Sequence, residues 1–390
     1  MNKTSQNQGE GRARLERCLG YLEQDPQNQH LLAEASDLAL SLNDLTTARD
    51  LVVRALNLSP HDPHFKFRLS CVARGERNWA ETAKLCEELL GAGNDDPAIH
   101  YNLGHAAAML GRFEDAKTHL LPLADKTDKF PNAPHLLVRT LHYLEELDEA
   151  RTIGEAHMTL YPDDATMAGM LGTLCTDLED FNAARQWSEL ALKGKPDNLD
   201  ALVTAGTVAL GDEDGTRAGV FFEKALAVDP NNGRAWLGQG MASMLGFDLK
   251  TACASLERAA QAMPDHLGTW NALAWCELLD NDIAAAEKTF NHAMDIDRNF
   301  GETHGGLAVI AALQGRLEDA TRQSDIALRL DDKSMAAKFA KSLILQRMGK
   351  AQAGQELLRD AFASFQVAGG GNLLEMLGRV ARKMPAGKKH

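Results

Sequence analysis

Four histidines are the residues of this chain whose type and spacing come nearest to a metal site. His64, His105, His135 and His142 recur within one stretch of the sequence, and imidazole nitrogens both bind zinc and titrate near neutral pH. No HExxH pattern and no cysteine and histidine pair with metal-ligand spacing accompanies them. We therefore interpret these histidines as part of a solvated polar surface, and we expect no metal and no cofactor.

An acidic run at residues 211–215, with the sequence GDEDG, resembles the start of a calcium-binding loop. It lacks the downstream spacing of ligands that such a loop needs, so we expect a short acidic turn between two helices. No glycine-rich phosphate loop follows a predicted strand, and no serine, cysteine or lysine nucleophile has a recognisable base beside it. The sequence therefore predicts a protein that is not an enzyme and has no catalytic residue.

Composition limits the partners of the chain. Its 390 residues contain 41 lysines and arginines against 55 acidic residues, a formal net charge of −14, which argues against nonspecific attraction to nucleic acid or anionic lipid. Residues 1–14 are polar, and no run of 18 apolar residues occurs, so we expect a cytoplasmic protein without direct membrane insertion. The six cysteines form no CxxC pair and are expected to be reduced, packed thiols.

Small residues recur at a spacing of 34 residues, and they indicate the elements that carry every other feature. With Trp236 placed at position 4 of a repeat, position 20 reads Ala48, Thr82, Ala116, Ala150, Ala184, Ala218, Ala252, Ala286, Ala320 and Gly354. Position 8 reads Ser36, Ser70, Gly104, Val138, Gly172, Gly206, Gly240, Ala274, Ala308 and Ser342. Two helices approach closely only where side chains are short, so these positions predict helical hairpins packed in series.

The run from Trp236 through Gly240, Ala252 and Ala259 to Pro264 resembles the motif of the tetratricopeptide-repeat family. The resemblance implies an all-α fold, a right-handed superhelical solenoid of helix-turn-helix hairpins. Ten repeats follow in one frame, at residues 29–62, 63–96, 97–130, 131–164, 165–198, 199–232, 233–266, 267–300, 301–334 and 335–368.

The same frame assigns the two ends of the chain. We expect residues 1–11 to be disordered and residues 12–28 to form half a repeat, a single helix before the first hairpin. After the repeats, residues 369–384 read as a glycine turn followed by a capping helix that shields the end of the solenoid. The tail at residues 385–390 is expected to be disordered.

In this family the first helix of each hairpin lines a concave groove, and the resemblance implies that positions 2, 5, 6, 9, 12 and 13 point into it. In the N-terminal half of the chain these positions are polar, aromatic and locally basic, and include Arg68, Tyr101, Asn102, His105, His135, Arg139, His142 and Tyr143. In the C-terminal half they are apolar, and include Met241, Met244, Trp275, Leu278, Phe339 and Leu343. Two alternatives remain for the apolar half: its side chains pack between hairpins, or the C-terminal helix covers them.

These residues predict a scaffold or adaptor that binds a peptide or helix of a partner protein in the groove. The lysine and asparagine clamp of some relatives is absent, because the corresponding positions hold Ala33, Asp37, Phe67 and Cys71. Two other functions stay open: a self-assembling protein that forms homo-oligomers, and the recruiting subunit of a separate enzyme.

Overall fold

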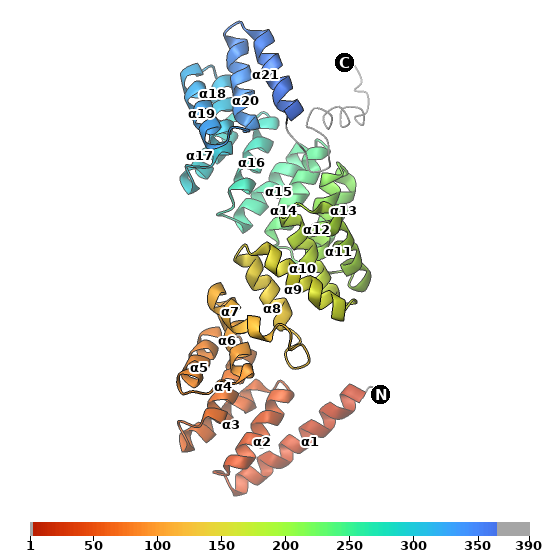
Figure 1. Ribbon diagram of the computed structural model, residues 1–390, viewed down its shortest axis with the longest axis vertical. Helices are drawn as coiled ribbons and strands as arrows, with labels where there is room; N and C mark the ends of the chain where they lie inside the picture. Colours follow the sequence, from red (N-terminus) through yellow and green to blue (C-terminus); the bar gives the residue numbers. More distant parts are fainter. Residues whose placement is uncertain (1–2, 365–390) are drawn as a thin grey trace. The chain divides into compact units, whose positions relative to one another are not determined.

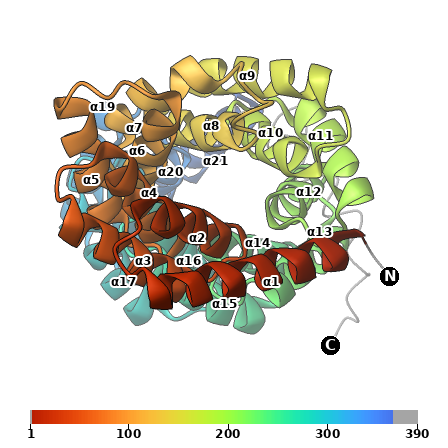
Figure 2. The same ribbon diagram turned by 90° about the horizontal axis from the view of Figure 1, so that it is seen from below.

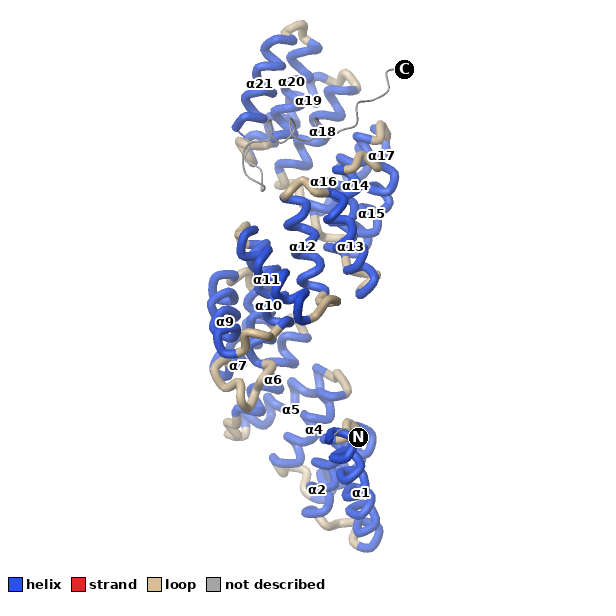
Figure 3. The backbone as a smooth tube through the Cα atoms, turned by 90° about the vertical axis from the view of Figure 1, so that its right-hand side faces the viewer, coloured by secondary structure: helices blue, strands red, loops and turns tan. Residues whose placement is uncertain are grey.

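The computed structural model describes residues 3–364 and divides into two compact parts, one that ends at Pro162 and one that begins at Asp163. The described residues form twenty-one α-helices and one short 3₁₀ helix, and they contain no strand (Figures 1 and 3). None of these helices is long and apolar enough to span a lipid bilayer. The prediction of an all-α fold built of tandem hairpins is confirmed.

The helices of the N-terminal part follow the predicted frame after one leading helix. They are α1 (Lys3–Gln24), α2 (Gln29–Ser41), α3 (Leu45–Leu58), α4 (Pro63–Gly75), α5 (Trp79–Gly91), α6 (Pro97–Met109), α7 (Phe113–Leu120), the 3₁₀ helix η1 (Leu121–Leu123), α8 (Ala133–Tyr143) and α9 (Leu147–Leu160).

The C-terminal part contains six hairpins in the same frame. Their helices are α10 (Ala165–Asp177), α11 (Phe181–Gly194), α12 (Leu199–Gly211), α13 (Gly215–Val228), α14 (Gly233–Leu245), α15 (Leu249–Ala262), α16 (Leu267–Leu279), α17 (Ile283–Ile296), α18 (Gly301–Leu313), α19 (Leu317–Leu330), α20 (Met335–Arg347) and α21 (Ala351–Ser364). Figure 2 shows several first helices on the inner side of their second helices, for example α4 inside α5 and α12 inside α13.

The turn inside each hairpin has one backbone conformation throughout the array. Position 15 has a positive φ in all ten repeats, and the residues are Asn43, Arg77, Gly111, Glu145, Glu179, Glu213, Phe247, Asn281, Gly315 and Gly349. The next residue caps the second helix in six repeats, because the side chain of Asp44, Asn78, Asp180, Asp214, Asp248 or Asp282 accepts a hydrogen bond from a backbone N–H of the first turn. A residue with a left-handed backbone followed by an N-cap residue reverses the chain direction over a few residues, and this sets the angle between the two helices of the hairpin.

The predicted small positions are the closest contacts of the hairpins. The residues at position 20 from Ala48 to Ala320 have no exposed surface. A Cβ atom at Gly206, at position 8, would lie 2.7 Å from the ring of Phe222 on the second helix of the same hairpin. In the sixth repeat, Phe222 occupies position 24. In the fourth repeat, position 24 is Gly154 and position 8 is the larger Val138, and both residues are buried. Large and small residues therefore exchange places across the hairpin while the packing is kept.

Phe222 also joins one hairpin to the next. A Cβ atom at Gly238 of α14 would lie 2.1 Å from Cζ of Phe222. The same arrangement recurs two repeats later, where a Cβ atom at Gly306 would lie 2.2 Å from Cζ of Phe290. Each phenylalanine is completely buried, so a glycine on the following first helix is what admits the ring.

Another close contact between consecutive hairpins joins two thiols. Sγ of Cys253 on α15 and Sγ of Cys276 on α16 lie 2.7 Å apart. Cys276 is fully buried, and Cys18, Cys86 and Cys175 are buried as well, in agreement with the expectation of packed side chains at these positions.

Three regions differ from the sequence expectation or lie beyond it. Helix α1 begins at Lys3, so the expected disorder of residues 1–11 is corrected for residues 3–11, which extend the leading helix by about two and a half turns. In the third repeat α7 ends at Leu120, because Pro122 has no backbone N–H to continue an α-helix, and a 3₁₀ turn follows. The glycine turn, the capping helix and the tail expected at residues 369–390 lie outside the described residues.

Replacing Phe247 with glycine should stabilise the protein. Phe247 has a φ of 57° and is 58% exposed. Its Cβ makes this left-handed backbone conformation unfavourable, and the ring gains little free energy from burial. We expect Phe247→Gly to raise the free energy of unfolding by about 1 kcal/mol, measured as a higher midpoint of thermal unfolding. Asn281→Gly, at the equivalent turn, should give a smaller gain because asparagine tolerates this conformation. A lower midpoint for Phe247→Gly would contradict the expectation.

Replacing Gly238 with alanine should destabilise the contact between consecutive hairpins. The added methyl group overlaps the buried ring of Phe222, and such overpacking costs about 1–3 kcal/mol. Urea unfolding of Gly238→Ala, of Phe222→Leu and of the double variant measures the coupling between the two sites. We expect the double variant to be more stable than the sum of the single effects, and simple additivity would show that the two residues do not compete for space.

Candidate partner-binding surface

The first helices of the hairpins carry the predicted groove residues, and these residues differ widely in exposure. Arg139, Tyr143 and Met241 are exposed, and Asn102 is buried. The other predicted residues are half-buried: Arg68, Tyr101, His105, His135, His142, Met244, Trp275, Leu278, Phe339 and Leu343. The inner face is therefore a mixture of surface and packing contacts.

Asn102 does not belong to the surface, and its prediction is corrected. Its side chain is 3% exposed, and its Nδ2 donates to Oγ of Ser70 at 3.2 Å and to Sγ of Cys71 at 3.4 Å. Both acceptors lie on the first helix of the preceding hairpin. Position 6 therefore faces the neighbouring hairpin here, and its amide ties α6 to α4.

Arg68 lies on the inner face, but its charge is neutralised by an ion pair with a carboxylate of the same chain. Its Nε and Nη2 donate to the two carboxylate oxygens of Asp37, each at 2.8 Å. A second ion pair joins Arg14 to Glu34, and all four side chains border one pocket of about 590 Å³. Because each cation there is already paired, this end of the surface has little capacity for an acidic ligand.

The half-buried side chains between α4 and α6 form an aromatic cluster around one arginine. The guanidinium of Arg74 lies 5.6 Å from the ring centroid of Tyr101, and the ring of His105 lies 5.0 Å from that of Trp79 and 6.2 Å from that of Tyr101. On its other side Tyr101 stacks on Phe130 at 5.3 Å. We refer to these five residues as the Arg74 cluster.

Two polar atoms of the Arg74 cluster are buried without a hydrogen-bond partner in the described structure: Nε of Arg74 and Nδ1 of His105. Burial, and secondly the charge of Arg74, lowers the pKa of His105 to about 4. His105 is therefore neutral at pH 7, and Arg74 provides the positive charge of the cluster.

The lowered pKa of His105 predicts how stability depends on pH. Below pH 6.5 the imidazole takes up a proton in the unfolded chain, whereas in the folded chain it does so only near pH 4. Folding stability is therefore lost as the pH falls through this interval. We expect the midpoint of urea unfolding to fall less between pH 7 and pH 5 in His105→Gln than in the wild type. The control His64→Gln, on an exposed histidine, should show the wild-type difference, and equal behaviour of the two variants would refute the assignment.

The remaining predicted aromatic and histidine residues lie on α8, each beside a different ring. His135 packs against His157 of α9 with ring centroids 5.0 Å apart. Tyr143 stacks on Phe113 at 4.6 Å, nearly parallel to it, and His142 lies 6.5 Å from Tyr143. Tyr143 is nevertheless 64% exposed, so one face of this stack is open to solvent.

In the C-terminal part, four predicted groove residues pack mainly between hairpins. Trp275, Leu278, Phe339 and Leu343 surround the buried cluster of Ala308, Val309 and Ala340. Trp275 also meets the ring of Phe290 edge-on, with the ring centroids 5.7 Å apart. Interhairpin packing, the alternative stated with the prediction, accounts for most of the surface of these four side chains.

Three apolar side chains on α14, α16 and α18 remain exposed. Met241 is 39% exposed, Leu279 is 59% exposed and Leu313 is 38% exposed. Leu279 and Leu313 both occupy position 13 of their repeats, so they lie at equivalent points of consecutive hairpins. We refer to these three residues as the apolar row.

Sequence reasoning missed the contributions of Trp79, Phe130 and Phe247. Trp79 and Phe130 occupy positions 17 and 34, outside the first helix, and they reach the Arg74 cluster only because hairpins pack side by side. Phe247 belongs to a turn, where its left-handed backbone leaves the ring exposed. Large aromatic residues at turn and linker positions were the available signal.

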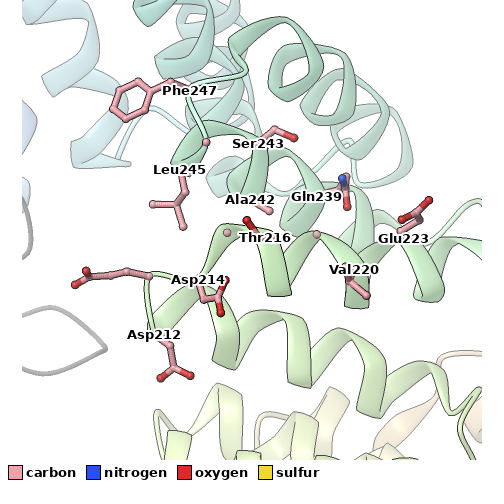
Figure 4. Close-up of a pocket in the computed structure, with 14 residues that line it drawn as sticks. Asp212, Asp214, Thr216, Val220, Glu223, Gln239, Ala242, Ser243, Leu245 and Phe247 are labelled. Atoms are coloured by element: carbon pink, nitrogen blue, oxygen red, sulfur yellow. The ribbon is translucent and has the colours of Figure 1, made fainter. Parts of the chain in front are cut away.

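A pocket of about 990 Å³ lies between α13 and α14, beside the turn that contains the acidic run (Figure 4). Phe247 and Asp212 lie on opposite sides of it. Asp212 pairs with Arg185 at 2.8 Å, and Asp214 caps α13 by accepting from the backbone N–H of Arg217 at 3.0 Å. The run thus forms the turn between α12 and α13, as the sequence analysis predicted, and at least two of its carboxylates have structural partners.

Comparisons with known proteins agree with this architecture. The family model described as tetratricopeptide repeat matches residues 73–139, and a search of curated proteins found no match. The crystal structure of the APC/C hetero-tetramer Cut9-Hcn1 is similar over 92% of this chain and 85% of that chain, with 13% identity and a TM-score of 0.54. The type IV pilus biogenesis factor PilW is similar over 53% of this chain and 96% of its own, with 19% identity and a TM-score of 0.46, which is too low to support an inference.

The fold is that of an α-helical repeat solenoid, with the frame and the small-residue contacts described above. Residues 73–139 match the tetratricopeptide-repeat family model, and the tandem hairpins of the described residues have the architecture of a tetratricopeptide-repeat solenoid. Proteins with this fold are generally scaffolds for protein interactions.

Proposed function

We propose that the protein is a non-enzymatic scaffold or adaptor that holds a peptide or helix of a partner protein against the inner face of its hairpins. The observation that carries this proposal is the apolar row. Exposed apolar side chains on several successive hairpins of an acidic protein are typical of protein-binding surfaces.

The position of the row supports the proposal. Met241, Leu279 and Leu313 lie on α14, α16 and α18, each the first helix of its hairpin. Figure 2 shows α14 on the inner side of α15 and α16 on the inner side of α17. Leu279 and Leu313 offer apolar contacts at equivalent points of consecutive hairpins, which suits one apolar face of a helix or extended segment. Methionine adds a flexible side chain that adapts to the ligand.

The proposal is tested by placing charges in the row. In Leu279→Lys combined with Leu313→Lys, each charged side chain should oppose burial of the row by an apolar ligand. We expect the immobilised wild-type protein to retain a partner from native lysate and the double variant to lose most of it, with unchanged helicity by circular dichroism.

The matched control is Leu330→Lys, because Leu330 is 45% exposed at the end of a second helix, α19. It should retain the partner as the wild type does. If all three proteins retain the same partner, the row is not the binding surface. If the only protein recovered is the chain itself, and light scattering gives a mass that grows with concentration, self-assembly replaces the scaffold as the explanation.

A further inference from the structure

Arg74 differs from the other arginines of the described chain in having a partly buried side chain and no carboxylate partner. Each of the other partly buried arginines of the described residues has one, for example Arg49 with Glu76 and Glu81, Arg68 with Asp37, and Arg185 with Asp212. Arg74 instead contacts the face of Tyr101, and its Nε is buried without a hydrogen bond in this part of the chain. A guanidinium that is partly removed from water gains most from an anion that accepts its N–H groups.

The surroundings of Arg74 hold it ready for such a ligand. The ring of Tyr101 lies under the guanidinium and is itself stacked on Phe130, so both planar groups are fixed before a ligand arrives, which lowers the entropic cost of binding. His105 supplies a second buried polar atom, Nδ1, that lacks a partner within the described structure. Trp79 and Tyr101 are half-buried and offer ring surface beside the charge.

We propose that the Arg74 cluster is a subsite for one acidic side chain, glutamate or aspartate, of the bound partner segment, with an apolar or aromatic neighbour of that residue packed on Trp79 and Tyr101. The proposal rests on the proposed scaffold function and names the chemistry of the ligand. It places the acid on α4 and α6 of the N-terminal part, on residues separate from the apolar row.

Charge favours a carboxylate over a phosphate. Arg74 is the only cation among the five side chains of the cluster, because His105 is neutral at pH 7. One guanidinium matches a single negative charge, whereas a phosphate monoester carries about −1.5 to −2 and usually gathers several cations. The net charge of −14 on the chain also opposes the approach of a polyanion.

The test uses arrays of dodecapeptides whose central residue is glutamate, glutamine or phosphoserine and whose flanking residues are varied in the same way in each array. The full-length protein is applied as wild type, as Arg74→Met and as Lys84→Met. The last is the matched control, because it removes one positive charge from the exposed surface of α5. Helicity and the thermal midpoint are measured for all three, and Arg74→Lys is added as a variant that keeps the charge but not the forked geometry.

We expect the wild type to bind the best glutamate peptides about tenfold or more tightly than their glutamine counterparts, as for other hydrogen bonds to charged groups. Arg74→Met should abolish this preference, Arg74→Lys should reduce it, and Lys84→Met should keep it. Equal binding of glutamate and glutamine peptides by the wild type overturns the proposal, and so does a preference that survives in Arg74→Met. Selective retention of phosphoserine peptides would assign the cluster to phosphate instead and also overturn it.

The outcome separates this inference from the function on which it rests. If peptides bind without any preference for glutamate while the partner captured from lysate still depends on Leu279 and Leu313, the scaffold function stands and the acidic subsite falls. If a glutamate preference is found while capture is unaffected by the lysines in the row, the subsite stands and the proposed binding surface moves to the N-terminal part.

Discussion

The close approach of helices at short side chains is the constraint on which the rest of this structure depends. At Gly206 and Gly238 there is no room for even one more carbon atom beside Phe222. Such contacts fix the distance both within a hairpin and between successive hairpins. Each first helix therefore meets its neighbours at a set separation, and the side chains on its inner face lie at regular intervals.

This regularity makes the exceptions informative. Most partly buried cations of the inner face are neutralised by the chain itself, as Arg68 is by Asp37, and many predicted groove residues turn out to pack between hairpins. The Arg74 cluster and the apolar row remain, one in each part of the chain. They differ in chemistry, since the first combines one charge with aromatic rings and the second is aliphatic with a methionine. A partner that met both would need a segment with acidic and apolar residues in different places.

The architecture could be predicted from the sequence because small residues recur at position 20 of the repeats and, with the exception of Val138, at position 8. The exposure of individual groove residues could not, because it depends on a neighbour in the adjacent hairpin. Asn102 occupies a position that points inward by the motif, yet Ser70 and Cys71 of the preceding hairpin offer acceptors that draw it inside. Trp275 is likewise drawn into packing against Ala308, Val309 and Ala340 of the following hairpins. Periodicity along one chain records which face of a helix is turned inward, but it does not record what the next helix presents to that face.

A comparable limit applies to the ends of elements. The start of α1 at Lys3 falls in a polar segment without apolar spacing, where no pattern marks a boundary. The break after Leu120 was visible as Pro122 in the sequence, but the 34-residue frame continues through it unchanged. The frame is thus maintained by the hairpin contacts even where one helix is shortened, and a repeat can lose part of its second helix without moving its neighbours out of register.

The pair of thiols between α15 and α16 gives the array a property that its other contacts lack. Contacts between hairpins break and reform, and a solenoid opens locally between neighbouring repeats because each repeat touches only the next. The Sγ atoms of Cys253 and Cys276 are separated by 2.7 Å, only about 0.7 Å more than a covalent sulfur bond. Loss of two electrons and two protons to a mild oxidant such as a peroxide would convert this contact into a disulfide that a reductant reopens, so that the two repeats would unfold together while it is intact. Oxidised and reduced samples of the same sequence would then differ in how these two repeats unfold.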